Sequence, residues 1–295
     1  MTKENGLIER RATGLLIVEV RNSNPNGDPD RESDPRQRQD GRGEISPVSF
    51  KRKLRDLIDD KEGKAWEEIS GNKLRPEGFC ILEHRGRDRK VIEKELQDDG
   101  TEFKKKYWDG RIFGNTFLEE GQSTSIKTGV VQFGLGVSIS PVKIERKTLT
   151  NKSGVEEGKD RGMAPLAYRI VEHGVYCMPF FVNPALAHKT KCTEEDVKVL
   201  LKVIPFAYRG TSSMIRNMVE IRHAWYMEHT SALGSCSDFA LIDALTPKRK
   251  EKEDTKKEGT EKPSTSWDDY DVPTKLPENL LNKLYEKKLR DLMNE

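Results

Sequence analysis

A buried strand, a long turn-rich loop and a helix start follow one another near the beginning of this sequence, and together they constrain its fold most strongly. Residues 13–20 (TGLLIVEV) are apolar and rich in β-branched side chains, and turn-forming residues follow them, so they predict a buried strand. Ser46 followed by Pro47 is typical of a helix N-cap with proline in the first turn. The helix is expected to place four apolar residues on its inner face: Val48, Leu54, Leu57 and Ile58.

Strands and helices alternate along the rest of the chain. Apolar runs predict three further strands, at residues 129–137, 174–182 and 220–227. Helical periodicity opened by Thr193 predicts a helix over 194–208, and residues 239–245 fit either a strand or a helix. This mixture predicts an α+β fold.

Three segments stand apart from this core. Residues 60–110 are dense in charge and predict an inserted surface lobe, with short helices near 64–69, 91–96 and 103–108. Residues 148–163 are polar and punctuated by glycine, which predicts a protruding hairpin or a flexible flap. The segment 246–266 is expected to be a disordered linker, because residues 248–266 are low in complexity. A C-terminal segment, 267–295, follows with an amphipathic helix expected over 280–293.

Charge and cysteine content limit the class of protein. The 295-residue chain is 35% charged and 34% hydrophobic, yet its net charge is only +2. Basic residues gather in blocks at 51–55, 85–90 and 104–106, which create local fields that the net charge hides. Four scattered cysteines without a CxxC pair indicate reduced thiols in the cytoplasm: Cys80, Cys177, Cys192 and Cys236. No apolar run approaches the roughly 20 residues of a membrane span, so no membrane association is expected.

The basic block in the first helix is a candidate phosphate site. Its members lie just past the helix N-terminus, where free backbone N–H groups and the macrodipole also favour anions: Lys51, Arg52, Lys53 and Arg55. Ser46 and Ser49 could add hydroxyl contacts there. The alternative is a solvated face on which aspartates at helical spacing pair with these cations.

A second basic segment follows the helix of residues 194–208. Arg209-Gly210-Thr211-Ser212-Ser213, followed by Arg216, places small hydroxyl residues between two arginines. Such a segment could cradle a backbone phosphate, and the alternative is a plain connection between a helix and a strand.

The acidic loop after the first strand offers a metal-site hypothesis. Several carboxylates could converge on Mg²⁺ or Ca²⁺: Asp28, Asp30, Asp34 and Asp40. The spacing is not that of an EF-hand, and the interspersed prolines favour a structured turn instead. The five histidines form no HExxH or triad-like pattern, and no Walker loop is present. No metal, no cofactor and no enzymatic activity are therefore expected.

The sequence resembles a known family over nearly its whole length. The motif NPNGDPD…PR…D…G…SFKRKLRD (from residue 24) is similar to the signature of the CRISPR-associated backbone subunit of type I Cascade complexes. The resemblance is to the Csd/Csh kind of types I-C and I-B. It continues through DGRIFG (109–114), GVVQFGLGVSISPV (129–142), EHGVYCMPFFVNPALA (172–187) and SALGS (231–235). It implies the RAMP superfamily, with an RRM-like (ferredoxin-like) palm over 1–245, a fingers lobe at about 60–126 and a thumb hairpin at about 148–163.

The resemblance also implies partners and roles. Copies of such a subunit polymerise head to tail along CRISPR RNA with other Cascade subunits, and they present the guide for pairing with target DNA. The implied RNA-binding residues are Ser46, Ser49, Lys51, Arg52, Lys53, Arg55, Arg209, Ser213 and Arg216, with Met163 as the wedge between bases. Related type III subunits cleave target RNA, so a metal-dependent ribonuclease using Asp28 and Asp30 is the alternative enzyme. A protein-only module whose basic helix binds acidic partners is the other alternative.

Overall fold

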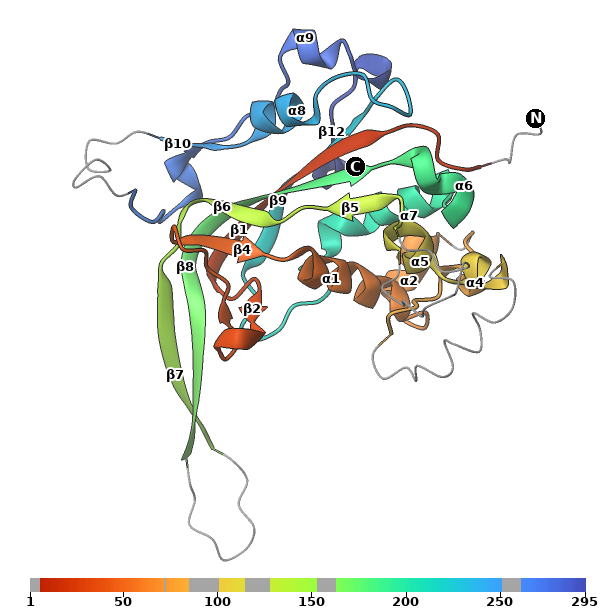
Figure 1. Ribbon diagram of the computed structural model, residues 1–295. Coiled ribbons are helices and arrows are strands. Elements are labelled where there is room, and N and C mark those ends of the chain that lie inside the picture. The colour runs from red at the N-terminus through yellow and green to blue at the C-terminus, as the bar shows by residue number, and fades with distance from the viewer. Residues whose placement is uncertain (1–5, 72, 85–100, 115–127, 153–162, 251–260) are drawn as a thin grey trace, which may run out of the picture.

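We describe the fold from a computed structural model of the chain. The structure describes residues 6–71, 73–84, 101–114, 128–152, 163–250 and 261–295. Within these residues the chain forms one large antiparallel sheet with helices on both of its faces (Figure 1). The prediction of a mixed α and β fold is therefore confirmed.

The main sheet has eight strands among the described residues. They are β1 (Ala12–Ser23), β4 (Arg42–Ile45), β5 (Val131–Phe133), β6 (Gly136–Pro141), β7 (Ile144–Lys152), β8 (Met163–Val182), β9 (Val219–Glu228) and β12 (Arg290–Asp291). Their order is β12-β9-β1-β8-β6-β4, and β5 and β7 also pair with β8. Short two-stranded pairs join β2 (Gly27–Asp28) to β3 (Asp34–Pro35) and β10 (Lys248–Arg249) to β11 (Tyr270–Asp271).

The strands expected at 13–20, 174–182 and 220–227 are confirmed as parts of β1, β8 and β9. The single strand expected at 129–137 is wrong, because β5 ends at Phe133 and β6 begins at Gly136. Gly134 lies between them, where a Cβ atom would come within 2.9 Å of the Pro179 ring. Its amide donates to the Pro179 carbonyl at 2.8 Å, so the chain passes too close to β8 for a side chain.

The helices are α1 (Pro47–Asp59), α2 (Lys64–Ser70), α4 (Thr101–Lys106), α5 (Trp108–Phe113), α6 (Ala187–Thr190), α7 (Glu194–Val203), α8 (Asp238–Leu245) and α9 (Glu278–Leu281). Short 3₁₀ turns are η1 (Pro29–Arg31), η2 (Pro76–Phe79), η3 (Pro184–Leu186), η4 (Ile204–Phe206), η6 (Trp267–Asp269), η7 (Tyr285–Lys287) and η8 (Leu292–Asn294). Thr193 caps α7 in a capping box with Asp196, as the sequence predicts. Residues 239–245, for which the sequence fits either a strand or a helix, belong to helix α8. No helix formed by the described residues is long and apolar enough to cross a membrane.

Two hydrophobic cores lie on opposite faces of the sheet. Leu16, Val18 and Val20 of β1 pack with residues of α1, α2, α5 and α7. Leu15 and Ile17 point to the other face, where they pack with α8 and the C-terminal segment. Figure 1 shows α8 and α9 on one side of the sheet and α1, α2 and α5 on the other. The continuous apolar run of β1 is explained by this double burial.

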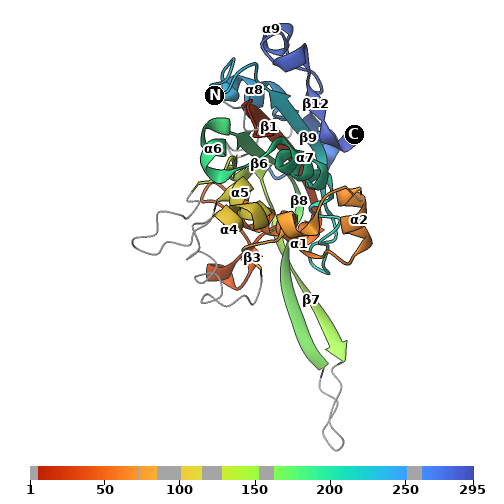
Figure 2. The ribbon, with the colours of Figure 1, turned by 90° about the vertical axis from the view of Figure 1, so that its right-hand side faces the viewer.

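The predicted hairpin is confirmed in its two arms. Strands β7 and β8 pair from Ile144↔Val171 to Lys152↔Met163, and Figures 1 and 2 show them projecting far from the sheet. The arms begin earlier and end later than the expected 148–163. The centre of the expected hairpin, residues 153–162, lies outside the described residues.

Helix α1 confirms the predicted N-cap but corrects one core residue. Ser46 is the N-cap and Pro47 lies in the first turn. Val48 is 74% exposed, so its expected place on the inner face is wrong. Phe50 takes that place, because it lies four and seven residues before Leu54 and Leu57 on the same helical face.

The lobe expected at 60–110 contains the short helices α2, α4 and α5 among its described residues. The helix expected at 64–69 is confirmed as α2. The one expected at 103–108 is instead divided between α4 and α5 at Tyr107, which is buried and extended. The helix expected at 91–96 lies outside the described residues.

The C-terminal segment differs most from expectation. The helix expected over 280–293 is wrong, because α9 ends at Leu281 and left-handed residues follow at Glu286 (φ 52°) and Lys287 (φ 49°). The linker expected over 246–266 is ordered in its described parts. Strand β10 pairs with β11, and Ser264 is buried. Residues 251–260 lie outside the described residues.

Candidate nucleic-acid interface

The first turn of α1 is held by the turn-rich loop that precedes it. The Ser46 hydroxyl accepts from the Ser49 amide at 3.2 Å and donates to the Asn26 side-chain oxygen at 2.8 Å. The Asn26 side-chain oxygen also accepts from the Ser46 backbone amide at 2.9 Å. The hydroxyl of Ser46 is therefore occupied as a cap that joins loop to helix, whereas Ser49 remains half-exposed at the helix mouth.

Two of the four predicted phosphate-binding cations are buried, which corrects the expectation that all four are open to a phosphate at the helix N-terminus. The Arg55 side chain is 5% exposed, and its Nε lies 2.9 Å from a carboxylate oxygen of Asp109, which is 1% exposed. Its NH1 also lies 3.0 Å from Glu83. Lys53 is 5% exposed and lies 3.3 Å from the Thr211 hydroxyl. Both cations therefore bind other parts of the same chain.

The other two cations of α1 lie nearer the surface. Arg52 forms an i,i+4 ion pair with Asp56 and donates to the Glu83 carbonyl at 2.6 Å. The ammonium of Lys51 lies 5.2 Å from the ring centre of Phe113. Burial lowers the pKa of Lys51, and the nearby positive charge of Arg55 lowers it further. The alternative to phosphate binding is that aspartates at helical spacing pair with these cations. Arg52 and Asp56 form such a pair.

The segment after α7 packs against the loop after β1. Arg216 donates through Nε to the Asn24 carbonyl at 2.8 Å, and the Asn24 amide donates to the Ile215 carbonyl at 2.7 Å. Arg209 instead forms an ion pair with Glu220, on the neighbouring strand β9. Ser213 is exposed. Arg209 and Arg216 are close in the sequence, but their side chains contact different partners and do not form one phosphate cradle.

The foot of the β7–β8 hairpin carries cations that the sequence analysis missed. Arg146 and Arg169 are direct cross-strand partners. Arg169 forms an ion pair with Asp34, whereas Arg146 is exposed and forms no ion pair with any residue that the structure describes. Like charges directly opposite one another on a sheet are destabilising. The strand pattern could have indicated this pair only once the hairpin register was known.

A cavity of about 290 Å³ opens beside these two arginines. It is lined by the loops after β1 and β2 as well as by the hairpin and the segment after α7, through Asn24, Glu32, Ser33, Asp34, Arg146, Ala167, Tyr168, Arg169, Met214 and Ile215. The side-chain oxygen of Asn24 is buried and meets no hydrogen-bond donor among the described residues. Met214 is 59% exposed at its rim. The cavity thus combines cations, an unused acceptor and apolar surface.

Two further sequence predictions concern this side of the molecule. Met163, the expected wedge, is the first residue of β8, at the far end of the hairpin, and its side chain lies outside what the structure describes. The Asp28 carboxylate accepts from the Asp30 amide at 3.2 Å and lies 3.8 Å from Arg36. These contacts agree with the structured turn. Within the described part of the chain, no three His, Cys, Asp or Glu side chains form a group that could hold a metal.

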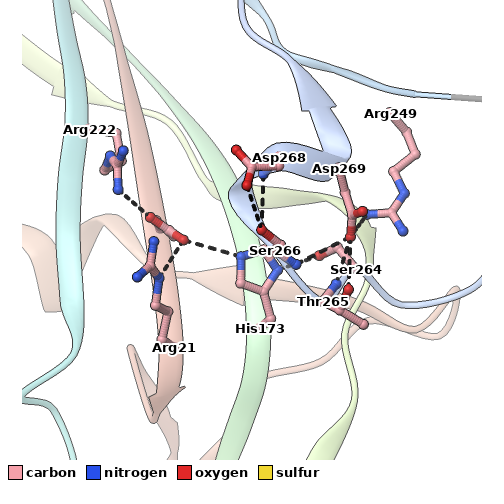
Figure 3. Close-up of polar contacts among 10 residues, drawn as sticks. Arg21, His173, Arg222, Arg249, Ser264, Thr265, Ser266, Asp268 and Asp269 are labelled. Atoms are coloured by element: carbon pink, nitrogen blue, oxygen red, sulfur yellow. Dashed lines mark hydrogen bonds and ion pairs between the residues drawn. The ribbon is translucent and has the colours of Figure 1, made fainter.

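A buried acid on the opposite side of β1 was also missed by the sequence analysis. Glu19 is 3% exposed and contacts Arg21, Arg222 and His173. Burial raises the pKa of Glu19, but hydrogen bonds from His173 and Arg21 and the two arginine charges outweigh it, so the pKa falls to about 2. His173 also lies 2.7 Å from the Ser264 hydroxyl, which joins β8 to the C-terminal segment (Figure 3). This network joins β1, β8 and β9 to the C-terminal segment.

Comparison with known proteins gives the family. A family model for CRISPR-associated protein Cas7 matches residues 10–275. Among solved structures, one similar chain comes from a "CRISPR RNA-guided surveillance complex, pre-nicking", with 15% identity, TM-score 0.47 and coverage of 73% of this chain and 77% of that one. Another, from a "CRISPR RNA-guided surveillance complex", has 17% identity, TM-score 0.45 and coverage of 73% and 68%. A third, from a type III-B Cmr-beta complex bound to cognate target RNA, has 12% identity, TM-score 0.40 and coverage of 73% and 60%.

The comparison with curated proteins gives no match. The family match extends over most of the chain and includes β1, α1, the hairpin and β9. It confirms the resemblance drawn from the sequence motifs at the level of the family. The chain belongs to the family of CRISPR-associated protein Cas7.

Proposed function

We propose that the chain is a CRISPR RNA-binding backbone subunit of a type I Cascade effector complex. Copies assemble head to tail along the guide with the other Cascade subunits, and the exposed guide segments pair with target DNA. The subunit itself is non-catalytic and acts in the cytoplasm. Membership of the family supports the RNA-guided role, and the four unpaired cysteines agree with a reducing compartment.

The order of elements supports an RRM-like palm. A β-α-β-β-α-β series is formed by β1, α1, β6, β8, α7 and β9, and the four strands lie in the order β9-β1-β8-β6. This is the order of a ferredoxin-like sheet, with the first strand between the last and the third. In this proposal the lobe of α2, α4 and α5 is the fingers, and the β7–β8 hairpin is the thumb.

The observation that carries the proposal is the facing pair Arg146 and Arg169 beside the cavity at the hairpin foot. A phosphate between the two guanidiniums would relieve their repulsion and accept charge-assisted hydrogen bonds from both. The buried Asn24 oxygen needs a donor, and the ribose 2′-hydroxyl of RNA supplies one where DNA has none. The site therefore suits a ribonucleotide.

The buried cations of α1 take a different role in this proposal from the one that the sequence suggested. Lys53 contacts the segment after α7, and Arg55 contacts α5, so both hold the walls of the RNA path in place. Lys51, Arg52 and Ser49 remain as candidate guide contacts at the helix mouth. Asp28 is engaged with its own turn and Arg36, which supports a scaffold role for the acidic loop.

The test is an Arg146→Ala variant of the full chain, assayed with a short single-stranded RNA over a series of salt concentrations. One lost phosphate contact should lower the salt slope, log K against log[salt], by about 0.7 for a single strand. Affinity should fall about tenfold, which corresponds to about 1.4 kcal/mol. Lys147→Ala is the matched control, because Lys147 is the next residue of β7 and pairs with Glu145.

Binding of a DNA strand of the same sequence provides the second arm. We expect weaker binding than to RNA, because the Asn24 oxygen then has no 2′-hydroxyl to accept from. An unchanged salt slope in Arg146→Ala would show that the foot of the hairpin does not contact RNA. An equal loss of RNA affinity in the Lys147→Ala control would show that the effect comes only from the change in overall charge.

A further inference from the structure

A second basic groove lies on the opposite face of the sheet from α1 and α7. It has a volume of about 700 Å³ and is formed between β9, β12 and the C-terminal segment. Trp225 of β9 lines it and belongs to the core shared with α8 and the C-terminal segment. Ala224 and Tyr226, the neighbours of Trp225, belong to the core shared with α1 and α7. The groove is therefore separate from the hairpin foot.

The rim of the groove carries an excess of positive charge. Lys275, Lys287 and Lys288 line it, are exposed, and form no ion pair with any residue that the structure describes. Arg290 forms an ion pair with Glu295 at 2.5 Å, and the Asp291 carboxylate lies 2.7 Å from the His223 ring nitrogen Nδ1. Three lysines that form no ion pair with the described residues thus line one concave surface.

The backbone holds one of these lysines, Lys287, in an unusual conformation. Glu286 and Lys287 are consecutive non-glycine residues with left-handed φ angles of 52° and 49°. Such conformations are unfavourable for residues that carry a Cβ atom. They end the helical path of the segment and leave Lys287 and Lys288 side by side on the rim.

Trp225, which lines the groove, carries an unpaired donor. Its indole N–H is buried and meets no acceptor among the described residues, although a buried polar group normally has a partner. The Trp225 ring is 4% exposed, and the His223 ring stacks on it with centroids 4.8 Å apart. The groove therefore offers a ligand no open aromatic face at Trp225.

The apolar part of the lining consists of leucine side chains: Leu276, Leu281 and Leu289. Binding of single-stranded nucleic acid relies on bases that stack on exposed aromatic rings. Leucines cannot provide such stacking, and Trp225 is too buried to do so. An extended peptide suits the surface better, because apolar side chains fill the leucine floor, carbonyl groups accept from buried donors, and carboxylates reach the lysines.

We propose that this groove binds an acidic peptide segment of a partner protein, with alternating carboxylate and apolar side chains. The carboxylates contact Lys275, Lys287 and Lys288, and a peptide carbonyl accepts from the Trp225 indole. This proposal does not rest on RNA binding by the other face. It adds to the molecule a second surface with a different kind of partner.

The probe for this proposal is a fluorescein-labelled decapeptide of alternating glutamate and leucine, titrated with the full chain after removal of nucleic acid. A decapeptide with glutamine in place of glutamate is the matched ligand control. In the double variant Lys287→Ala/Lys288→Ala, affinity should fall about 5- to 20-fold, since each exposed ion pair is worth up to about fivefold. Lys64→Ala/Lys189→Ala makes the same charge change at two exposed lysines that do not line the groove, and affinity should stay within about twofold.

A second measurement follows the indole directly. The N–H resonance of Trp225, identified by its loss in Trp225→Phe, should shift downfield when the glutamate–leucine peptide binds, because the proton gains an acceptor. The chemical shift of this N–H is measured without the lysine variants, and a change in overall charge alone would not alter it.

Several results would overturn the proposal. One is an absence of binding of the glutamate–leucine peptide at millimolar concentration. Another is binding of the glutamine peptide with equal affinity. The third is a Trp225 N–H resonance that does not shift when the glutamate–leucine peptide is added. A single-stranded RNA that binds wild type but not Lys287→Ala/Lys288→Ala would assign the groove to nucleic acid instead. Self-association abolished by the same variant in sedimentation experiments would assign it to a second copy of the chain.

Discussion

Replacing Arg55 with methionine removes the guanidinium that faces the buried carboxylate of Asp109. That carboxylate accepts from Arg55 Nε at 2.9 Å, from the Leu82 amide at 2.7 Å and from the Glu83 amide at 3.2 Å. Loss of one partner of a buried ion pair typically costs about 3–5 kcal/mol. The two amides remain, so we expect the lower end, about 3 kcal/mol.

Thermal unfolding of the full chain measures this loss. At about 2–4 °C per kcal/mol for chains of this size, the midpoint should fall by about 6–12 °C. Arg52→Met is the matched control on the same helix. Its ion-pair partner Asp56 is 31% exposed, and exposed i,i+4 pairs contribute only about 0.3–0.5 kcal/mol. The control should therefore melt within about 2 °C of wild type.

Addition of Asp109→Asn to Arg55→Met should restore part of the lost stability, because the uncompensated charge disappears. The opposite result is also informative. If Arg55→Met melts like wild type but loses RNA affinity, Arg55 is a guide contact, as the sequence suggested, and the structural reasoning is wrong.

Two further predictions concern the strand β1 and its partners. Glu19 has a folded-state pKa of about 2 against an ordinary 4.5, so its stabilisation is present above about pH 4.5 and is lost as the pH falls towards 2. Melting temperatures of Glu19→Gln should therefore be lower than wild type near neutral pH and converge with it in acid, and parallel curves would contradict the assignment. In Gly14→Ala, the new Cβ would lie 2.1 Å from ring carbons of Phe180, which is fully buried. We expect a loss of about 1–3 kcal/mol in urea unfolding, and a wild-type midpoint would show that the ring can move aside.

The parts of the fold that the sequence predicts correctly depend on residues close together in the chain. The Ser46 cap, the capping box at Thr193 and the strand of residues 13–20 are set by local hydrogen bonds and by periodicity. The prediction for residues 280–293 is wrong although the apolar spacing fits a helix. Burial of Leu284 and Leu292 against the sheet outweighs that local preference.

The candidate site could be predicted only in outline. The basic block of α1 is evident in the sequence, but its side chains divide between exposed and buried places. Lys53 meets Thr211 and Arg55 meets Asp109, across separations of 158 and 54 residues. Arg146 and Arg169 face each other only because β7 and β8 pair in one particular register. A shift of one residue would turn either side chain to the other face.

The sequence by itself therefore determined the family, the mixture of α and β elements and the starts of β1, α1 and α7, because these depend on motifs and periodicities within a few residues. Tertiary structure alone decided which cations are buried in ion pairs, which face each other at the hairpin foot, and which remain unpaired in the groove beside Trp225. The physical reason is that the environment of a charge is set by whatever packs around it. Those neighbours come from strands and loops far apart in the chain.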